Sequence, residues 1–274
     1  MKNKVYKGAP LPFMGQKRKF LKEFTNALKD YPKGAVYVDL FGGSGLLSHT
    51  VKHHYPDATV IYNDYDNYRK RIKAIPFTNV LISKIRLIAH ELPRDKRITG
   101  IARERILKLV ATAEKQNGYV DYITLSSSLL FSMKYVLNYD DLVKSTLYNT
   151  VRKSNYEATG YLEGLQVVNE DYKVLFDKYK DAENVIFLVD PPYLQTNVST
   201  YKNYWSLKDY LDVLQVLKGT KYFYFTSNKS SIIELCEWIG TQTITANPFD
   251  GSETRSMTNA PSYNTSYTDI MLFK

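Results

Sequence analysis

The pattern of apolar and polar positions along the chain predicts an α/β protein. Five short, mostly apolar runs predict buried parallel strands, at 35–40, 59–63, 166–169, 185–189 and 222–226. Apolar residues at helical spacing predict helices beside them, at 16–29, 46–54, 172–179, 207–217 and 231–239. Strands that alternate with helices in this way are typical of a Rossmann-like fold built on a parallel sheet.

The end of the chain departs from this rhythm. Runs at 241–245 and 269–273 predict an antiparallel pair that closes the sheet. The stretch 247–267 is rich in Ser, Thr and Asn and predicts a long loop, either a clamp that faces a polyanion partner or a disordered excursion.

The middle of the chain departs as well. Residues 68–118 have a helical pattern and are basic, whereas 139–165 are polar and rich in Tyr and Asn. We therefore predict that 1–74 and 166–274 are the two parts of one α/β domain, and that 75–165 form an inserted, largely helical lobe.

Charge changes this picture because it is concentrated in the predicted lobe. The net charge is +9, and residues 67–115 hold 13 Lys and Arg against 4 Asp and Glu, so the rest of the chain sums to zero. A basic block of this kind favours a polyanion as partner, although a solvated helical face explains it equally well. The 24 tyrosines can stack on bases or pack in a core.

Composition excludes several other classes of protein. A single cysteine, Cys236, allows no internal disulfide and no Cys-based zinc cluster, and the four histidines show no metal-binding spacing. No apolar run has transmembrane length, and the first residues have no signal-peptide core. These features predict a cytoplasmic protein with no metal site and no membrane association.

A glycine-rich turn follows the strand predicted at 35–40. The turn runs from Asp39 to Gly45, and its glycines lack the spacing of the dinucleotide fingerprint. Asp39 and Asp64 each end a predicted strand, and two carboxylates disfavour a phosphate but favour a cationic or hydroxyl-rich ligand. S-adenosylmethionine, with its amine, sulfonium and ribose, has this chemistry. The alternative is a purely structural strand-to-helix turn.

A second motif follows the apolar strand at 185–189. The chain there continues as Asp190-Pro191-Pro192-Tyr193, a rigid extended turn whose prolines cannot donate hydrogen bonds. The Asp190 carboxylate and the Pro191 carbonyl can each accept one hydrogen of an exocyclic amine, which localises the nitrogen lone pair for attack on a methyl group. Tyr193 would stack on the base. The alternative is a rigid turn without chemistry.

With these motifs in this order, the chain resembles the D12 or Dam-type family of DNA adenine methyltransferases. Residues 11–17, Leu-Pro-Phe-Met-Gly-Gln-Lys, resemble the family's amino-terminal "PFxxGGK" motif, with Gln16 in place of the second glycine. The resemblance implies that Phe13 packs on the cofactor and that Lys17 contacts it or orders the site. Residues 169–172 resemble the segment that contacts the adenine of the cofactor, and 226–228 resemble the "SN" motif beside the base pocket.

The resemblance implies an S-adenosylmethionine methyltransferase fold and a defined set of residues. We expect these residues to bind S-adenosylmethionine: Phe13, Lys17, Asp39, Phe41, Gly43, Gly45, Asp64, Asp171, Tyr172 and Asp190. Asp190, Pro191, Pro192 and Tyr193 are expected to be catalytic.

The recognition hairpin of the family has no clear counterpart in this sequence. By position and residue type, we expect these residues to contact DNA: Arg94, Lys96, Arg97, Arg152, Lys153, Asn155 and Tyr156. The expected partner is duplex DNA, with a cognate restriction endonuclease as a further partner. We expect a monomer or weak dimer associated with the nucleoid.

The sequence therefore favours a site-specific enzyme that methylates N6 of a flipped-out adenine in duplex DNA. One alternative is a methyltransferase that acts on RNA or on a protein amide. The other is a catalytically silent DNA-binding protein on the same scaffold, against which the retained Asp190, Asp64 and glycine turn argue.

Overall fold

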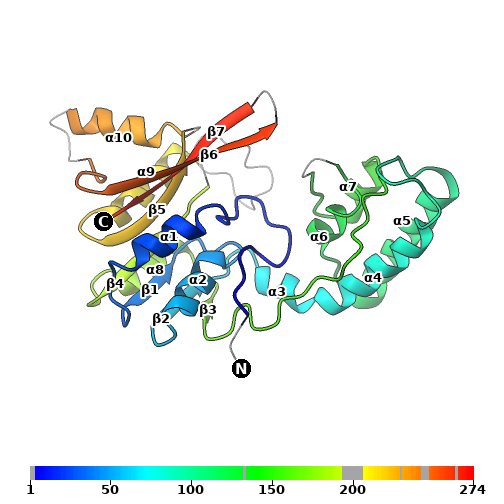
Figure 1. The fold of residues 1–274 in the computed structure, drawn as a ribbon, viewed down its shortest axis with the longest axis horizontal. Helices are drawn as coiled ribbons and strands as arrows, with labels where there is room; N and C mark the ends of the chain where they lie inside the picture. The colour runs from blue at the N-terminus through cyan, green and yellow to red at the C-terminus, as the bar shows by residue number, and fades with distance from the viewer. Residues whose placement is uncertain (1–3, 132–133, 193–205, 229, 242–246, 263–264) are drawn as a thin grey trace. The chain divides into compact units, whose positions relative to one another are not determined.

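The computed structural model describes residues 4–131, 134–192, 206–228, 230–241, 247–262 and 265–274 (Figure 1). The chain divides into two compact units. The first, which we call the sheet unit, comprises Met1–Gly8, Gln16–Asn67 and Leu162–Lys274, and the second, the helical unit, comprises Ala9–Gly15 and Tyr68–Tyr161. The three-part division drawn from the sequence stays a prediction.

The described residues of the sheet unit form a seven-stranded sheet in the order β3-β2-β1-β4-β5-β7-β6. The strands are β1 (Val36–Asp39), β2 (Thr59–Asn63), β3 (Gln166–Val168), β4 (Val185–Val189), β5 (Lys221–Ser227), β6 (Glu253–Ser262) and β7 (Thr265–Phe273). Strands β1 to β5 pair in parallel, and β7 pairs antiparallel with both β5 and β6. The strand order reverses between β1 and β4, which is where doubly wound sheets bind ligands.

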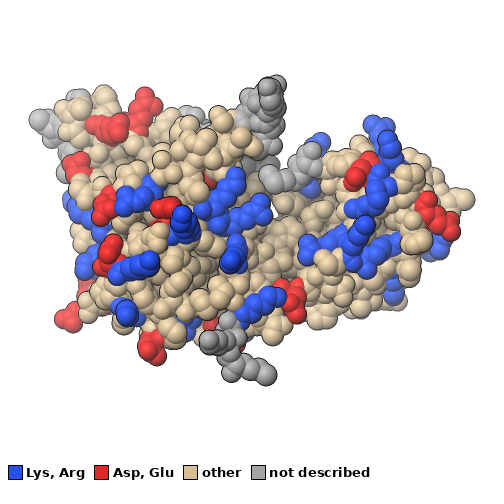
Figure 2. Space-filling model, in the orientation of Figure 1, with Lys and Arg blue, Asp and Glu red and all other residues tan. Residues whose placement is uncertain are grey.

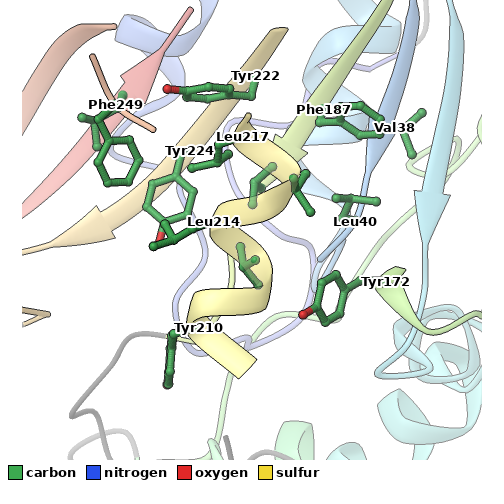
Figure 3. Packing of buried hydrophobic residues seen from close by; sticks show 14 of the residues in the cluster. Val38, Leu40, Tyr172, Phe187, Tyr210, Leu214, Leu217, Tyr222, Tyr224 and Phe249 are labelled. Carbon is green, nitrogen blue, oxygen red and sulfur yellow. The ribbon is translucent and has the colours of Figure 1, made fainter. Parts of the chain in front are cut away.

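Helices cover both faces of this sheet (Figure 1). They are α1 (Leu21–Leu28), α2 (Leu46–His54), α8 (Tyr172–Tyr179), α9 (Leu207–Leu217) and α10 (Ile232–Thr241). Alternation along each strand assigns neighbouring residues to opposite faces, so Tyr37 packs in one apolar cluster and Val38 in the other. Figure 3 shows the second cluster, to which Val38 and Phe187 contribute from the sheet and Leu214 and Leu217 from α9.

The opposite face is covered by α1 and α2 and is rich in aromatic rings. The ring of Phe24 on α1 meets those of Phe223 and Phe225 on β5 edge-on, at centroid distances of 4.9 and 6.1 Å. Edge-to-face pairs add to the stability gained by burying apolar area. This packing attaches α1 to the middle of the sheet, and so holds the residues that precede α1 near the end of β4.

The helical unit contains α3 (Tyr68–Lys73), α4 (Ile75–Ile88), α5 (Gly100–Asn117), α6 (Tyr122–Ser126) and α7 (Tyr139–Lys144). A buried ion pair ties its pieces together, because Arg71 Nε lies 3.1 Å from the Asp121 carboxylate. The same guanidinium donates through Nη2 to the Pro12 carbonyl at 2.8 Å and to Thr124 Oγ1 at 3.1 Å. Residues 9–15 therefore belong with this unit. None of the helices described is long and apolar enough to cross a membrane.

Two expectations for the end of the chain are wrong. Thr241 ends α10, the rest of 241–245 lies outside the described residues, and β7 pairs instead with β5 and β6. The expected loop at 247–267 contains β6 and the start of β7. The polar composition of this stretch predicted a loop because β6 is an edge strand with mostly exposed polar side chains. Its pairing with β7 defines it as a strand, and no apolar pattern does.

The expected helix at 16–29 is also shorter in the structure. Helix α1 begins at Leu21, and the preceding residues form turns. Lys17 therefore lies before the helix, where its side chain reaches the sheet edge.

We predict that Gly42→Ala destabilises the protein. A Cβ at this position would lie 2.4 Å from the Tyr62 ring and 2.7 Å from the Asn63 carbonyl oxygen. Overpacking of this kind costs about 1–3 kcal/mol, and thermal unfolding would measure it. Gly34→Ala is the matched control, since its Cβ would meet nothing within 4 Å. Equal melting temperatures for the two variants would contradict the close packing of Tyr62 on the turn.

Candidate active site

Polar residues gather at the edge of the sheet unit where the parallel strands end. In the register of the sheet, Asp39 at the end of β1 is level with Tyr62 on β2 and with Leu188 on β4. Asp64 follows β2 directly and Asp190 follows β4 directly. The carboxylates that the sequence places far apart therefore share one edge, at the point where the strand order reverses.

The glycine turn is held in place by Tyr62. Gly43 and Gly45 have φ values of 49° and 73°, in the left-handed region that glycine adopts without strain, and Gly45 precedes α2. The Tyr62 hydroxyl lies 2.8 Å from the Gly43 carbonyl oxygen and 3.1 Å from Asp64 Oδ1. One side chain thus links the turn to the acid at the end of β2. No pattern in the sequence marks Tyr62 for this role, because an apolar strand offers no signal for where a hydroxyl points.

Asn63 joins three strand ends. Its Nδ2 donates to the carbonyls of Leu40 at 3.0 Å and Glu170 at 2.9 Å, and its Oδ1 accepts from the Glu170 amide at 3.0 Å. Asn169 Nδ2 adds a bond of 2.7 Å to the Asp64 carbonyl. Buried and fully bonded, Asn63 fixes residues 169–171 beside the glycine turn. No motif in the sequence marks Asn63 for this role either.

Asp39 is a buried carboxylate that is only half satisfied. Its Oδ2 accepts a hydrogen bond of 2.6 Å from Ser48 Oγ, whereas Oδ1 has no hydrogen-bond partner among the described residues. Burial raises the pKa of Asp39 to about 7, with a further rise from Asp190, while Ser48, the Phe41 amide and Lys17 lower it. A buried acceptor without a donor suits a cationic donor that arrives with a ligand.

An aromatic pair lies at the same edge. The rings of Phe41, in the glycine turn, and Tyr172, at the start of α8, have centroids 4.9 Å apart. Asp171 is exposed, and its Oδ1 accepts from the Lys173 amide at 2.8 Å as the cap of α8. The sheet unit thus brings Phe41 and Tyr172 together with Asp39. The Asp171 carboxylate, by contrast, caps the amino-terminal end of α8.

Lys17 and Asp190 form an ion pair at the end of β4. Lys17 Nζ lies 2.6 Å from Asp190 Oδ2, and the two side chains are 7% and 18% exposed. Burial raises the pKa of Asp190 above its ordinary value, the Lys17 ammonium lowers it, and the charge of Asp269 raises it. Pro191 is buried and Pro192 is half-buried, whereas Tyr193 lies outside the described residues. The structure therefore joins the amino-terminal motif to the Asp-Pro-Pro motif by direct contact.

Phe13 and the residues expected to bind DNA belong to the helical unit. The Phe13 ring packs edge-on against Tyr68, at a centroid distance of 5.7 Å. Its expected contact with a cofactor stays a prediction.

One of the expected DNA-binding residues, Arg94, helps to hold a loop of the helical unit, residues 152–155. Arg94 Nη1 donates to the Val151 carbonyl at 2.7 Å, and Arg86 Nε donates to the Arg152 carbonyl at 3.0 Å. On the other side of the loop, Asn79 Oδ1 accepts from the Tyr156 amide at 2.8 Å, and its Nδ2 donates to the Tyr156 carbonyl at 2.9 Å. The loop is fastened at both ends.

The side chains of this loop differ in exposure. Residues 152–155 are exposed, and the Arg152 guanidinium lies over the Tyr156 ring, 4.3 Å from its centroid. Tyr156 itself is 7% exposed and its hydroxyl lies 3.2 Å from Ser127 Oγ. Lys153 and Asn155 are therefore exposed side chains on a backbone that is held in place, whereas the Tyr156 side chain is buried under the loop.

The remaining expected DNA-binding residues, Lys96 and Arg97, are also exposed and lie beside this segment. The Lys96 carbonyl accepts from the Asn149 amide at 2.9 Å, and Arg97 forms an isolated β-bridge with Tyr148. Among the described residues, no group of three or more His, Cys, Asp and Glu side chains gathers to hold a metal ion.

Comparison with known proteins adds two matches. The model of a family described as D12 class N6 adenine-specific DNA methyltransferase matches residues 13–235. A curated Haemophilus influenzae protein, which bears the name "Putative methyltransferase", is 39% identical over 244 residues, covering 86% of this chain and 81% of that protein.

We predict that Asp39→Asn stabilises the protein at alkaline pH. The pKa of Asp39 is about 7 in the folded protein against an ordinary 3.8, so ionising this group opposes folding increasingly between these two values and fully above pH 7. The variant should raise the free energy of unfolding at pH 8 by on the order of 1–3 kcal/mol, and by less at pH 5. Urea unfolding at both pH values measures this difference.

Asp57→Asn is the control for this prediction, because Asp57 is exposed. It should give no gain that depends on pH. A loss of stability in Asp39→Asn at pH 8 would show that the carboxylate stabilises the fold rather than serving a ligand.

Proposed function

The chain belongs to the family of D12 class N6 adenine-specific DNA methyltransferases, and from this membership we propose that it transfers a methyl group from S-adenosylmethionine to N6 of an adenine in duplex DNA. The observation that carries the proposal is the Lys17–Asp190 pair, which lies at the same sheet edge as the glycine turn and Asp39. This edge is where a cofactor site and an acceptor site would meet.

The residues at the sheet edge fit S-adenosylmethionine chemically. Asp39 Oδ1, buried and lacking a donor among the described residues, suits the cationic amine of the methionine part. Asp64 suits the ribose hydroxyls, and the rings of Phe41 and Tyr172 offer an apolar surface. Gly43 and Gly45 give the turn its left-handed backbone conformation without strain. When bound, the cofactor supplies a methyl group on a positively charged sulfur.

Asp190 and Pro191 would hold the acceptor amine. The Asp190 carboxylate accepts one N6 hydrogen and the Pro191 carbonyl the other, so the nitrogen lone pair is directed out of the ring plane. Lys17 keeps the carboxylate charged and oriented, because its ammonium lies 2.6 Å from Oδ2 and so leaves Oδ1 for the base. Much of the rate gain then comes from positioning, which can contribute about 7–11 kcal/mol. Tyr193, the expected stacking partner of the base, lies outside the described residues.

The helical unit is the part we propose to bind the DNA backbone. Figure 2 shows Lys and Arg side chains gathered on one face of this unit, at the right of the view. The exposed, fastened loop at 152–155 offers Arg152, Lys153 and Asn155, residue types that contact phosphates and base edges. Such contacts help to offset the few kcal/mol that flipping a base out of the duplex costs. A restriction endonuclease partner, a monomeric or weakly dimeric state and a nucleoid location stay predictions from the sequence.

We predict that Asp190→Ala lowers methyl transfer to duplex DNA far more than it lowers the affinity for S-adenosylmethionine, although Asp190 is also among the expected cofactor-binding residues. Loss of the acceptor for the N6 hydrogen removes both positioning and charge, so the rate should fall at least about a thousandfold. Transfer of tritiated methyl groups measures the rate, and calorimetry measures cofactor affinity. Asp181→Ala is the control, since Asp181 is exposed in the loop before β4.

Unchanged transfer in Asp190→Ala would remove Asp190 from its proposed role. Wild-type activity on RNA or on a protein amide, without activity on duplex DNA, would overturn the proposed acceptor.

We also predict that Lys153→Ala weakens DNA binding. Loss of one phosphate contact should reduce the slope of log affinity against log salt by about one. Filter binding or fluorescence anisotropy at several salt concentrations gives this slope. Lys218→Ala, at an exposed position in the sheet unit, should leave the slope unchanged. Identical slopes for both variants would exclude a phosphate contact at Lys153.

A further inference from the structure

The carboxy-terminal hairpin of β6 and β7 extends the sheet beyond β5 and carries polar residues toward the proposed acceptor site. On β5 and β7, Phe225 and Met271 pack in the same apolar cluster, beneath α1. Because side chains alternate along a strand, Ser227 and Asp269 lie on this same face, two positions further toward the carboxyl end of β5. The apolar face thus gives way to polar side chains at the edge where β4 ends in Asp190.

Asp269 is held in place by Asn259 of the neighbouring strand. Asn259 Nδ2 donates to Asp269 Oδ2 at 2.6 Å, and Asn259 is 3% exposed. The Oδ1 atom of Asn259 is buried and has no hydrogen-bond partner among the described residues. A buried amide that leaves its own oxygen unsatisfied is costly, and here it orients a carboxylate. The pair does not form part of the hydrophobic clusters of the fold.

Asp269 lies within electrostatic reach of the Lys17–Asp190 pair. Its negative charge raises the pKa of Asp190, and the pKa of the nearby Tyr267, raised chiefly by burial, responds to both Asp269 and Lys17. Lys17 Nζ also lies 6.0 Å from the ring centroid of Phe225 on β5, the strand between β4 and β7. Lys17, Asp190 and Asp269 therefore lie at the same end of the sheet, as does the buried Asp39.

We propose that Asp269, oriented by Asn259, is a positioning residue of the acceptor site that balances the charge of Lys17 around Asp190. This inference rests on the proposed function. Without Asp269, the positive charge of Lys17 would make the Asp190 carboxylate a weaker hydrogen-bond acceptor. A second carboxylate restores negative potential. The N6 nitrogen becomes more positive as its lone pair forms the new bond, so this potential favours the transition state.

Among the described residues, the charged and titratable groups that interact electrostatically with Asp190 or with Lys17 lie on β1 and β7. They are Asp39 at the end of β1, and Tyr267 and Asp269 on β7. Lys17 itself lies before α1 and Asp190 after β4. Lys17 is the positive charge in this set, so removing Asp269 leaves Asp190 more strongly ionised.

The test is Asp269→Asn, which removes the charge but keeps an amide oxygen to accept from Asn259. We expect kcat on duplex DNA to fall roughly tenfold, with KM for S-adenosylmethionine and the melting temperature close to wild type. Loss of a nearby negative charge lowers the pKa of Asp190. The acid limb of the pH–rate profile should therefore move to lower pH, which a purely structural role would not cause.

Two further variants separate charge from packing. Asn259→Ala removes the orienting donor but keeps the carboxylate, so kcat should fall by less and the acid limb should stay near its wild-type position. Asp250→Asn removes an exposed carboxylate from the turn before β6 and should behave as wild type. Wild-type kcat and an unmoved acid limb in Asp269→Asn would overturn the inference. A fall in kcat that comes with a lower melting temperature, and with no shift of the acid limb, would overturn it as well.

Titration of the Asp190 carboxylate by NMR in wild type and Asp269→Asn decides the inference without any methylation assay. A lower pKa of Asp190 in the variant supports it, and an unchanged pKa overturns it. If wild-type protein methylates no DNA, the proposed function fails on its own, and the titration still answers whether Asp269 acts on Asp190.

Discussion

The contact on which the proposed site depends is the ion pair between Lys17 and Asp190. Both side chains are mostly buried, so their transfer from water is unfavourable, and the attraction compensates only if the geometry is close, as the 2.6 Å separation is. That geometry requires β4 to end at the sheet edge and α1 to pack on β5 through Phe24. The aromatic layer under α1 therefore serves to place a lysine as well as to stabilise the fold.

Around this pair, buried polar side chains fall into two groups with opposite roles. Tyr62 and Asn63 bond to backbone carbonyls and hold the glycine turn and residues 169–171 at fixed positions. Asp39 and Asn259 each keep an oxygen without a partner among the described residues, which lowers the stability of the fold. Rigid surroundings allow such groups to persist, and sites that bind or react commonly hold them.

The helical unit shows that a count of charges overstates the surface open to DNA. Arg71 is buried against Asp121, and Arg86 and Arg94 donate to backbone carbonyls that fasten the loop at 152–155. Arginine suits this role because its planar group donates several hydrogen bonds in a fixed arrangement. Part of the basic block therefore shapes the unit, and the exposed remainder, such as Lys96, is left for a polyanion.

The sequence by itself determined the order of strands and helices of the sheet unit up to α10, because buried parallel strands are continuous apolar runs and amphipathic helices repeat with their own period. It also determined the residue types of the proposed site, since Asp-Pro-Pro-Tyr and the glycine turn are local in the chain. Tertiary structure alone decided that Lys17 contacts Asp190, that Tyr62 holds the glycine turn, and that β6 pairs with β7. These depend on strand register and on long-range pairing, for which a polar edge strand such as β6 leaves no periodic signal.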